Sequence, residues 1–346
     1  MRMRHFVLLA FALVACAPTL PPSGGSSPLA GTAPAGRGAA KDTIFITVAG
    51  QPGAVTFAAP PYSVWASSQS IFEAIPLGLN ARGDLFVGED QPSGLLEELG
   101  PPYTAPPKQV GTLSYAIGLV VDKHNNVWVA ENNSVQEYSP PSYKLTNTLH
   151  HPNQQLNYPQ SIVALPSGQL AVGRTESAAG VTAAPGAVDI YTQKSAHHFL
   201  KSSIKNIPYP EALAVDHSGN LVVAECSACV SAGQTDNLLL SVPPPYKKVT
   251  RVIQELPNVS LEEMAVAPQG DLFLNESGTI FRYSEPFTSG HPLSQTSYVS
   301  ALNVDSAGDL IYISGSSVYL LNAPYRGKPS LILAGSGTLE QIATSP

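Results

Sequence analysis

Short apolar segments recur along the chain in pairs, with a few polar residues between the two members of a pair. Residues 116–121, A-I-G-L-V-V, and residues 127–131, V-W-V-A-E, form one such pair. Short apolar runs bounded by Gly, Asn and Asp are typical of strands that are covered on both faces. The Gly, Asn and Asp residues between the two members suit the positive φ that a tight hairpin requires. Each pair is therefore predicted to be a β-hairpin.

The predicted hairpin recurs about every 40 to 50 residues, a period that is typical of repeat architectures. A residue at the turn before the second segment serves as the anchor of each unit, and the anchors are Asp42, Asp84, Asn126, Gln169, Asn220, Asp271 and Asp309. A third apolar segment follows each hairpin, at residues 54–57, 95–99, 135–138, 188–191, 238–242, 280–283 and 318–321. A Pro-rich corner and a more polar fourth segment complete the unit. Four antiparallel strands in a unit of this length form the blade of a β-propeller.

The two ends of the chain hold complementary parts of one unit. Residues 339–346, L-E-Q-I-A-T-S-P, are similar to the start of the unit at residues 261–268, L-E-E-M-A-V-A-P, and the continuation of that unit is found at residues 39–46. Six units are complete, and the seventh takes its first strand from the C-terminus and its other three from residues 42–67. An open ring would leave unpaired strand edges. We therefore predict an all-β, seven-bladed propeller over residues 42–346, closed by pairing of the C-terminal strand with the N-terminal strands.

Six of the seven corners contain proline followed by an aromatic residue, as in Pro101-Pro102-Tyr103. Proline makes the corner rigid and the aromatic side chain covers the blade edge, so we interpret this motif as a fold device. The third complete unit departs from it at residues 193–199, which include His197 and His198. These two histidines, like the pair at residues 150 and 151, lack the spacing of metal ligands and are expected to be solvated.

Five residues after the anchor, four units carry a glutamate, namely Glu89, Glu131, Glu225 and Glu276. Repetition at one position favours a structural role, in which the carboxylates accept hydrogen bonds from buried backbone N–H groups. Arg174 takes this position in another unit and is expected to form a structural ion pair, with Glu131 or Glu225 as candidate partners.

The N-terminus has the features of a targeting segment. Arg2 and Arg4 precede an apolar run, and residues 13–16, L-V-A-C, resemble the bacterial lipoprotein box. This resemblance implies that residues 1–15 are a signal peptide and that Cys16 receives a lipid that anchors the protein to a membrane. Since Ala17 follows the cysteine, the resemblance favours the outer membrane or cell surface of a bacterial envelope. The alternative is an ordinary secretory signal with an incidental Cys16.

Residues 16–41 are rich in Pro, Gly, Ser and Ala and contain no acidic residue. Such a segment buries too little apolar surface to fold, so we expect a disordered linker after the lipidated cysteine. The two other cysteines, Cys226 and Cys229, are predicted to form a loop disulfide, because an exported protein meets an oxidising environment.

Charge is distributed unevenly between the linker and the predicted propeller. The formal net charge is −7, yet all 25 acidic residues lie in residues 42–346. A domain this acidic is a poor partner for nucleic acid or anionic lipid, although it suits a cationic or metal ligand. We expect a monomer with no nucleic-acid partner, whose membrane contact is made by the N-terminal lipid.

Two segments carry a family resemblance. Residues 210–225, P-E-A-L-A-V-D-H-S-G-N-L-V-V-A-E, and residues 116–131 resemble the NHL repeat, whose pattern is P-x-G-I-A-V-D-x-x-G-N-I-Y-V-A-D. The resemblance extends over residues 42–346 and implies a β-propeller. NHL-like propellers include interaction modules, lactonase relatives and lyases, so the resemblance implies no single activity.

The residue nine positions before the anchor opens the innermost strand of each blade, and by analogy it faces the mouth of the central channel. The polar members of this series are Gln160, Glu211, Glu262, Ser300 and Glu340. We take these five residues as candidate ligand-binding residues. The three glutamates lie in one sector of the ring and are candidate ligands for Ca²⁺ or Mg²⁺, which prefer oxygen donors. The alternative is that each carboxylate is hydrated at a wet channel mouth.

Two classes of function agree with these patterns. The first is a lipid-anchored propeller that binds a protein, peptide or glycan without turnover, and a purely structural envelope component differs from it only by its partner. The second is a metal-dependent enzyme of the lactonase-like or streptogramin-lyase-like type. Because the channel-mouth series contains no histidine and the ligand set of a lactonase is absent, we favour the binding module; the catalytic residues of an enzyme would be unknown.

Overall fold

The structure of the protein is a computed structural model, and the chain divides into two compact units, Met1–Thr32 and Ala33–Pro346. All described residues belong to the second unit. They are residues 41–49, 53–67, 71, 74–149, 159–175, 186–194, 197–207, 209–226, 237–256, 261–295, 299–334 and 338–345. Over these ranges, no helix has the length and apolar character needed to cross a membrane.

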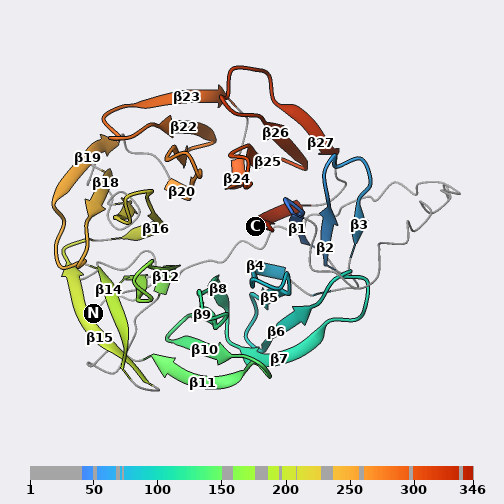
Figure 1. Ribbon diagram of the computed structural model, residues 1–346, viewed down its shortest axis with the longest axis horizontal. Coiled ribbons are helices and arrows are strands. Elements are labelled where there is room, and N and C mark those ends of the chain that lie inside the picture. Colours follow the sequence, from blue (N-terminus) through green and yellow to red (C-terminus); the bar gives the residue numbers. More distant parts are fainter. Residues whose placement is uncertain are drawn as a thin grey trace, which may run out of the picture. The chain divides into compact units, whose positions relative to one another are not determined.

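The described residues form seven antiparallel sheets of four strands, which we call blades and number from the first complete one (Figure 1). Blade 1 contains β4 (Ala74–Leu79), β5 (Leu85–Glu89), β6 (Gly94–Leu99) and β7 (Lys108–Leu113). Blade 2 contains β8 (Ala116–Val121), β9 (Val127–Glu131), β10 (Val135–Ser139) and β11 (Lys144–Leu149). Blade 3 contains β12 (Pro159–Ala164), β13 (Leu170–Arg174), β14 (Ala187–Lys194) and β15 (His197–Lys205).

The remaining blades follow the same order. Blade 4 contains β16 (Pro210–Val215), β17 (Leu221–Glu225), β18 (Asn237–Val242) and β19 (Arg251–Leu256). Blade 5 contains β20 (Leu261–Val266), β21 (Leu272–Glu276), β22 (Thr279–Tyr283) and β23 (Gly290–Gln295). Blade 6 contains β24 (Val299–Val304), β25 (Leu310–Ser314), β26 (Ser317–Leu321) and β27 (Ser330–Ala334). Blade 7 joins β28 (Thr338–Thr344) to β1 (Ile44–Ala49), β2 (Ala54–Ala58) and β3 (Ala66–Ser67).

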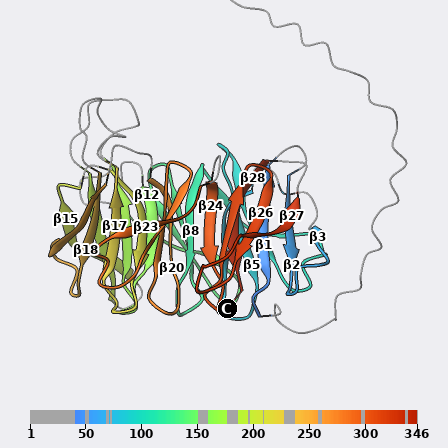
Figure 2. The same cartoon turned by 90° about the horizontal axis from the view of Figure 1, so that it is seen from above.

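The predicted seven-bladed propeller with a shared closing blade is confirmed. In blade 7, β28 pairs with β1 in the register Ile44↔Thr344 and Ile46↔Ile342. Each first strand contacts the first strand of the next blade, and the contact between β28 and β4 closes the ring. In the side view the strands run side by side from one face of the ring to the other (Figure 2). The ring therefore has no open blade face at the junction of the chain ends.

The anchor residue of blade 7 lies one position later in the chain than predicted. In each blade, the N–H four residues before the anchor donates to the anchor carbonyl, as from Asp216 N to Asn220 O at 2.9 Å. In blade 7 this bond runs from Ser345 N to Thr43 O at 2.9 Å. Thr43 is therefore the anchor of blade 7. Asp42, with φ of 57°, takes the place held by a positive-φ glycine such as Gly219 in other blades.

The core consists of apolar layers between neighbouring blades. The buried residues described form seven clusters, and each cluster joins residues of two adjacent blades. The second strand of each blade is the most buried, and in β5, β9, β13, β17 and β21 every residue is buried. Because burying one large apolar side chain stabilises by about 1.5–3 kcal/mol, these layers hold the blades together.

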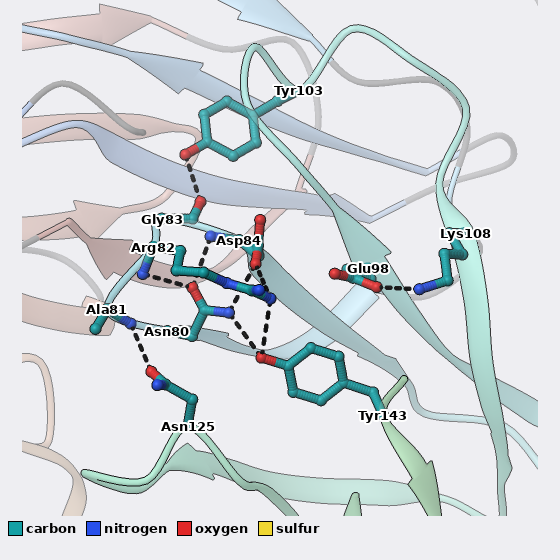
Figure 3. A network of polar contacts seen from close by, with 10 residues as sticks. All are labelled: Asn80, Ala81, Arg82, Gly83, Asp84, Glu98, Tyr103, Lys108, Asn125 and Tyr143. Carbon is teal, nitrogen blue, oxygen red and sulfur yellow. Dashed lines mark hydrogen bonds and ion pairs between the residues drawn. The ribbon is translucent and has the colours of Figure 1, made fainter. Parts of the chain in front are cut away.

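The corner aromatics take part in these layers and in the turns. Tyr103 packs edge-on against Phe45 of blade 7, with ring centroids 4.8 Å apart. Its hydroxyl donates to Gly83 O of its own blade at 2.6 Å (Figure 3). The hydroxyl of Tyr143 instead accepts from Asn80 Nδ2 of blade 1 at 2.8 Å (Figure 3). The corner motif thus ties blades together, as a fold device should.

Blade 3, which lacks the motif, places a histidine in this role. His198 packs edge-on against Trp128 of blade 2 with centroids 4.5 Å apart. Its side chain is 3% exposed, and Nδ1 lies 3.6 Å from Oε2 of Glu137. The expectation that His198 is solvated was wrong, because the imidazole fills the space that a corner aromatic fills at other interfaces. His150 and His151 lie outside the described residues, and so does the side chain of His197.

Candidate binding site in the central channel

Each innermost strand carries a β-bulge near its start. In β8, Ala116 pairs with Glu131 and Gly118 pairs with Ala130, so Ile117 is the extra residue. The same irregularity occurs in the six other innermost strands. The skipped residues include every position of the series nine before the anchor. A bulge interrupts the ladder and re-aims side chains, so the repeat provides seven equivalent positions at one end of the channel.

Two of the candidate residues lie beside the same tyrosine. Tyr209 donates from its hydroxyl to Oε1 of Gln160 at 3.0 Å. Burial raises the pKa of Tyr209 to about 12, and the negative charge of Glu211 adds to this effect. Gln160 and Glu211 therefore flank Tyr209 at the boundary between blades 3 and 4.

Ser300 and Glu340 line a common cavity of about 440 Å³, which we call the mouth pocket. Its other lining residues include Ile75, Ser316, Leu339 and Gln341. Ser300 Oγ donates to Leu339 O at 3.2 Å, which links blade 6 to the closing strand. The mouth pocket thus combines two apolar side chains with hydroxyl, amide and carboxylate groups.

The structure does not describe the predicted trio of carboxylates as one site. The side chain of Glu262 lies outside the described residues, so the full Glu211, Glu262 and Glu340 set is untested. In the part of the chain that the structure describes, no group of three His, Cys, Asp or Glu residues could hold a metal ion. Ca²⁺ or Mg²⁺ binding at these glutamates stays a prediction.

A second cavity of about 430 Å³ lies along the bore of the channel, and we call it the bore pocket. Five innermost strands from β12 to β28 contribute to its wall. Its aliphatic lining includes Val163, Leu213, Val215, Met264, Leu302 and Ile342. The polar side chains in its lining are those of Glu263 and Asn303. Aliphatic residues are the more numerous in its lining, yet polar atoms make up the larger part of the surface that the pocket exposes.

Glu263 is a channel residue that sequence reasoning missed. Its Oε1 accepts from Gln341 Nε2 at 2.9 Å, and its Oε2 accepts from Leu302 N at 3.4 Å. Gln341 also lines the mouth pocket, so this hydrogen bond joins the two pockets. The feature that would have indicated Glu263 is the bulge in β20, which leaves both Glu262 and Glu263 out of the strand pairing. The repeat pattern alone does not reveal a bulge.

The glutamates five residues after the anchor were expected to accept hydrogen bonds from backbone N–H groups, and Glu89 and Glu131 do so. Glu89 Oε2 accepts from Leu95 N at 2.8 Å, and Glu131 Oε1 accepts from Ser114 N at 3.0 Å. Burial raises the pKa of Glu131, an effect that these hydrogen bonds oppose. The ion pair seen for Arg174 is with Asp189 of its own blade, at 2.8 Å between Nε and Oδ2. The sequence did not identify Asp189 as its partner.

The predicted covalent features fall largely outside the described residues. Cys226 is buried at the end of β17, whereas Cys229 is outside them, so their disulfide stays a prediction. Cys16, the signal peptide over residues 1–15 and most of the linker also lie outside. The structure therefore does not test lipidation or export.

No family model and no curated protein matches the chain. Solved structures do match: one from Lactobacillus plantarum has a TM-score of 0.64 and 12% identity, and covers 89% of this chain and 100% of that chain. A streptogramin B lyase structure has a TM-score of 0.56 and 10% identity, and covers 79% and 94%. A putative 6-phosphogluconolactonase from Bacteroides uniformis has a TM-score of 0.66 and 10% identity, and covers 88% and 99%. At these identities the likeness shows the fold alone. The protein is thus a seven-bladed β-propeller with two adjoining pockets in its channel.

Proposed function

We propose that the protein is a lipid-anchored, NHL-like propeller of the bacterial envelope that binds a ligand in its central channel without turnover. The observation that carries this proposal is the pair of adjoining pockets, of about 440 and 430 Å³, joined by the hydrogen bond between Gln341 and Glu263. Both volumes lie within the range of about 300–1,000 Å³ that is usual for ligand sites. The wall's polar groups are fixed by the scaffold, as in the bond from Asn303 Nδ2 to Ile342 O at 3.1 Å. Fixed groups of this kind orient a ligand.

Binding is tested with the full chain carrying Cys16→Ala, which removes the predicted lipid site, and with the neutral fluorophore N-phenyl-1-naphthylamine. Ser316 is exposed and lines the mouth pocket, so Ser316→Trp is expected to obstruct entry and weaken binding about tenfold or more. Ser330→Trp places the same side chain at an exposed position on the outer strand β27 and serves as the control. Equal fluorescence titrations for both variants would contradict binding in the channel.

The anchor is tested separately in cells. The unaltered chain is expected in the membrane fraction with a lipid on Cys16, identified by mass spectrometry of the N-terminal peptide. Cys16→Ala should move the protein to the soluble fraction, because two or three acyl chains make a stable anchor. Membrane retention of that variant would contradict lipid anchoring.

A metal-dependent propeller enzyme is the second candidate. It is favoured by the recurrence of glutamate at one bulge position, in Glu211, Glu262 and Glu340, and by the streptogramin B lyase among the structures of like fold. In this function a Ca²⁺ or Mg²⁺ ion would bind the carboxylates. Stoichiometric Ca²⁺ or Mg²⁺ that is lost on Glu211→Gln plus Glu262→Gln would support it. An unchanged melting temperature in chelator, with no bound metal, would exclude the metal site.

A further inference from the structure

The junction between blades 4 and 5 holds a cavity of about 390 Å³, which we call the blade 4–5 groove. Its lining includes the turn of blade 4 around Asp216 and Asn220, Arg251 and Ile253 on β19, and the corner of blade 5 at residues 285–287. None of these residues lines the mouth pocket or the bore pocket. The groove is therefore a separate place on the propeller.

Two other junctions of the ring show a closed arrangement of charged groups at this place. At each of them a guanidinium pairs with the anchor carboxylate of one blade and lies over the ring of the next blade's corner tyrosine. The groups are Arg82, Asp84 and Tyr143 at blades 1 and 2 (Figure 3), and Arg282, Asp271 and Tyr325 at blades 5 and 6. The two ion pairs measure 2.7 and 2.8 Å. Paired charges thus occupy both junctions.

At blades 4 and 5 the same kinds of charged group border a cavity and do not pair. The anchor is the uncharged Asn220, and the corner carries Phe287, which has no hydroxyl. Arg251, Asp216 and Glu285 all line the groove, yet none of them belongs to an ion pair between described residues. Charges of opposite sign therefore border one open space.

The carboxylate of Asp216 is held in place without being neutralised. Asp216 is 8% exposed. Its Oδ1 accepts from Asn220 N and its Oδ2 accepts from Asn220 Nδ2, both at 2.8 Å. Both donors are uncharged, so these bonds orient the carboxylate and leave its negative charge. Arg251 and Glu285 are exposed, so their charged ends can turn toward a ligand.

These charges select the class of ligand. An ion with a single sign of charge is attracted by one side of the groove and repelled by the other. A small zwitterion meets both signs, since its carboxylate accepts hydrogen bonds from a guanidinium and its ammonium group donates to a carboxylate. Polar and apolar atoms contribute about equally to the exposed lining, which includes Ile253 and Pro286. The lining thus also accepts a small aliphatic group.

We propose that the blade 4–5 groove binds an α-amino acid with a small aliphatic side chain. Arg251 binds the carboxylate of the amino acid, Asp216 binds its ammonium group, and Ile253 packs against its side chain. The cavity of about 390 Å³ lies within the usual range for small-molecule sites, about 300–1,000 Å³. Because this site lies outside the channel, the inference goes beyond the proposed function and does not depend on it.

The experiment compares three probes of nearly equal shape: zwitterionic leucine, cationic leucinamide and anionic 4-methylpentanoate. Affinities for the full chain carrying Cys16→Ala are measured by titration calorimetry. We expect leucine to bind about three- to tenfold tighter than either analogue, since each analogue lacks one of the two charged contacts. Equal affinity for the three probes, or no binding of leucine, overturns the inference.

Two variants remove one charged contact each. Arg251→Gln should lower the affinity for leucine to about that for leucinamide, whereas Arg326→Gln removes an exposed guanidinium at the corner of blade 6 and should change nothing. Asp216→Asn should lower the affinity for leucine to about that for 4-methylpentanoate. The turn tolerates this change, because Asn80 holds the same position in blade 1 and accepts from Asp84 N at 2.9 Å.

Tryptophan variants locate the site. Ser218 is an exposed turn residue that lines the groove, so Ser218→Trp should obstruct it and weaken leucine binding about tenfold or more. Ser167→Trp changes the corresponding exposed residue of blade 3 and should leave leucine binding unchanged. Ser316→Trp, at the mouth pocket, should also leave it unchanged. Leucine binding that is lost in Ser316→Trp and retained in Ser218→Trp overturns this inference and leaves the proposed function standing.

Discussion

Blades 1 and 3 share a carboxylate at one of two facing positions of the repeat and carry opposite charges at the other. One position is the end of the second strand, held by Glu89 in blade 1 and by Arg174 in blade 3. The other position lies on the third strand, which pairs with the second. It is held by Glu97, which pairs with Val87, in blade 1, and by Asp189, which pairs with Val172, in blade 3. Blade 3 therefore joins a guanidinium to a carboxylate at 2.8 Å. Blade 1 brings two carboxyl groups together.

The surroundings of the two pairs are equally buried, so the difference lies in the charges. Arg174 is 5% exposed and Asp189 is fully buried, while Glu97 is 8% exposed. In blade 1, burial raises the pKa of Glu97 to about 7, and the charge of Glu89 adds to the effect. Oε2 of Glu97 has no hydrogen-bond partner among the residues described. Glu97 thus changes its charge near neutral pH.

Blade 2 shows an intermediate solution with one charge. There Gln136 takes the place of Glu97, and its Nε2 donates to Glu131 Oε2 at 2.8 Å. The three blades show that this place accommodates facing polar side chains of different charge, although it does not require them, because blades 4 and 5 carry Leu240 and Phe281 at the third-strand position. The energetic cost of altering them should therefore depend on the charge that is left behind.

The largest effect is expected on breaking the pair in blade 3. Arg174→Leu leaves the buried carboxylate of Asp189 without its guanidinium, and loss of one member of a buried ion pair costs about 3–5 kcal/mol. The measurement is urea unfolding of the full chain carrying Cys16→Ala. The double variant Arg174→Leu plus Asp189→Leu should recover most of the loss, because no buried charge remains. A double variant that is less stable than the single one would contradict this explanation.

The next effect is expected in blade 1 and depends on pH. Because the pKa of Glu97 is raised in the folded state to about 7 from 4.5, the native state binds more protons than the unfolded state between these values. The contribution of Glu97 to stability is therefore fully retained below about pH 4.5 and is lost as pH rises through about 7. Glu97→Gln reproduces the pair of blade 2. At pH 8 the free energy of unfolding of the Glu97→Gln variant should exceed that of the unaltered protein by about 1–3 kcal/mol.

This advantage should disappear as pH falls. At pH 4 the unaltered Glu97 is protonated in both states, so the two chains should unfold at nearly the same urea concentration. The relevant observation is the difference between the two chains at each pH, because other groups titrate in both. A difference that is constant from pH 4 to pH 8 would show that Glu97 does not titrate in this range.

The architecture was predictable because it follows from a pattern that repeats. Positive-φ turn residues, buried second strands and corner prolines each recur in several units, so a local uncertainty in one unit is corrected by the others. The exception was blade 7, where the anchor is Thr43 and not Asp42. There the unit is divided between the two chain ends, and only the hydrogen bond with Ser345 sets the register.

Residues that differ from the repeat were harder to place. His198 was expected on the surface, yet it packs on Trp128 because blade 3 lacks a corner tyrosine. Glu263 and Asp189 each depend on a partner in another strand, and neither spacing nor composition indicates such a partner. Candidate channel residues such as Ser300 and Glu340 came from the repeat position, and the structure places these two in one pocket.

The smallest effect is expected one residue from the titrating pair of blade 1. Glu98 follows Glu97 on β6 and pairs with Lys108 at 2.7 Å, but the lysine side chain is 60% exposed (Figure 3). Exposed ion pairs typically contribute about 0–1 kcal/mol, since water and salt screen them. Glu98→Gln should therefore change the urea midpoint little and equally at pH 4 and pH 8. Because neighbouring residues on a strand face opposite sides, this matched variant shows whether burial, and not the loss of a glutamate from β6, explains the effect of Glu97→Gln.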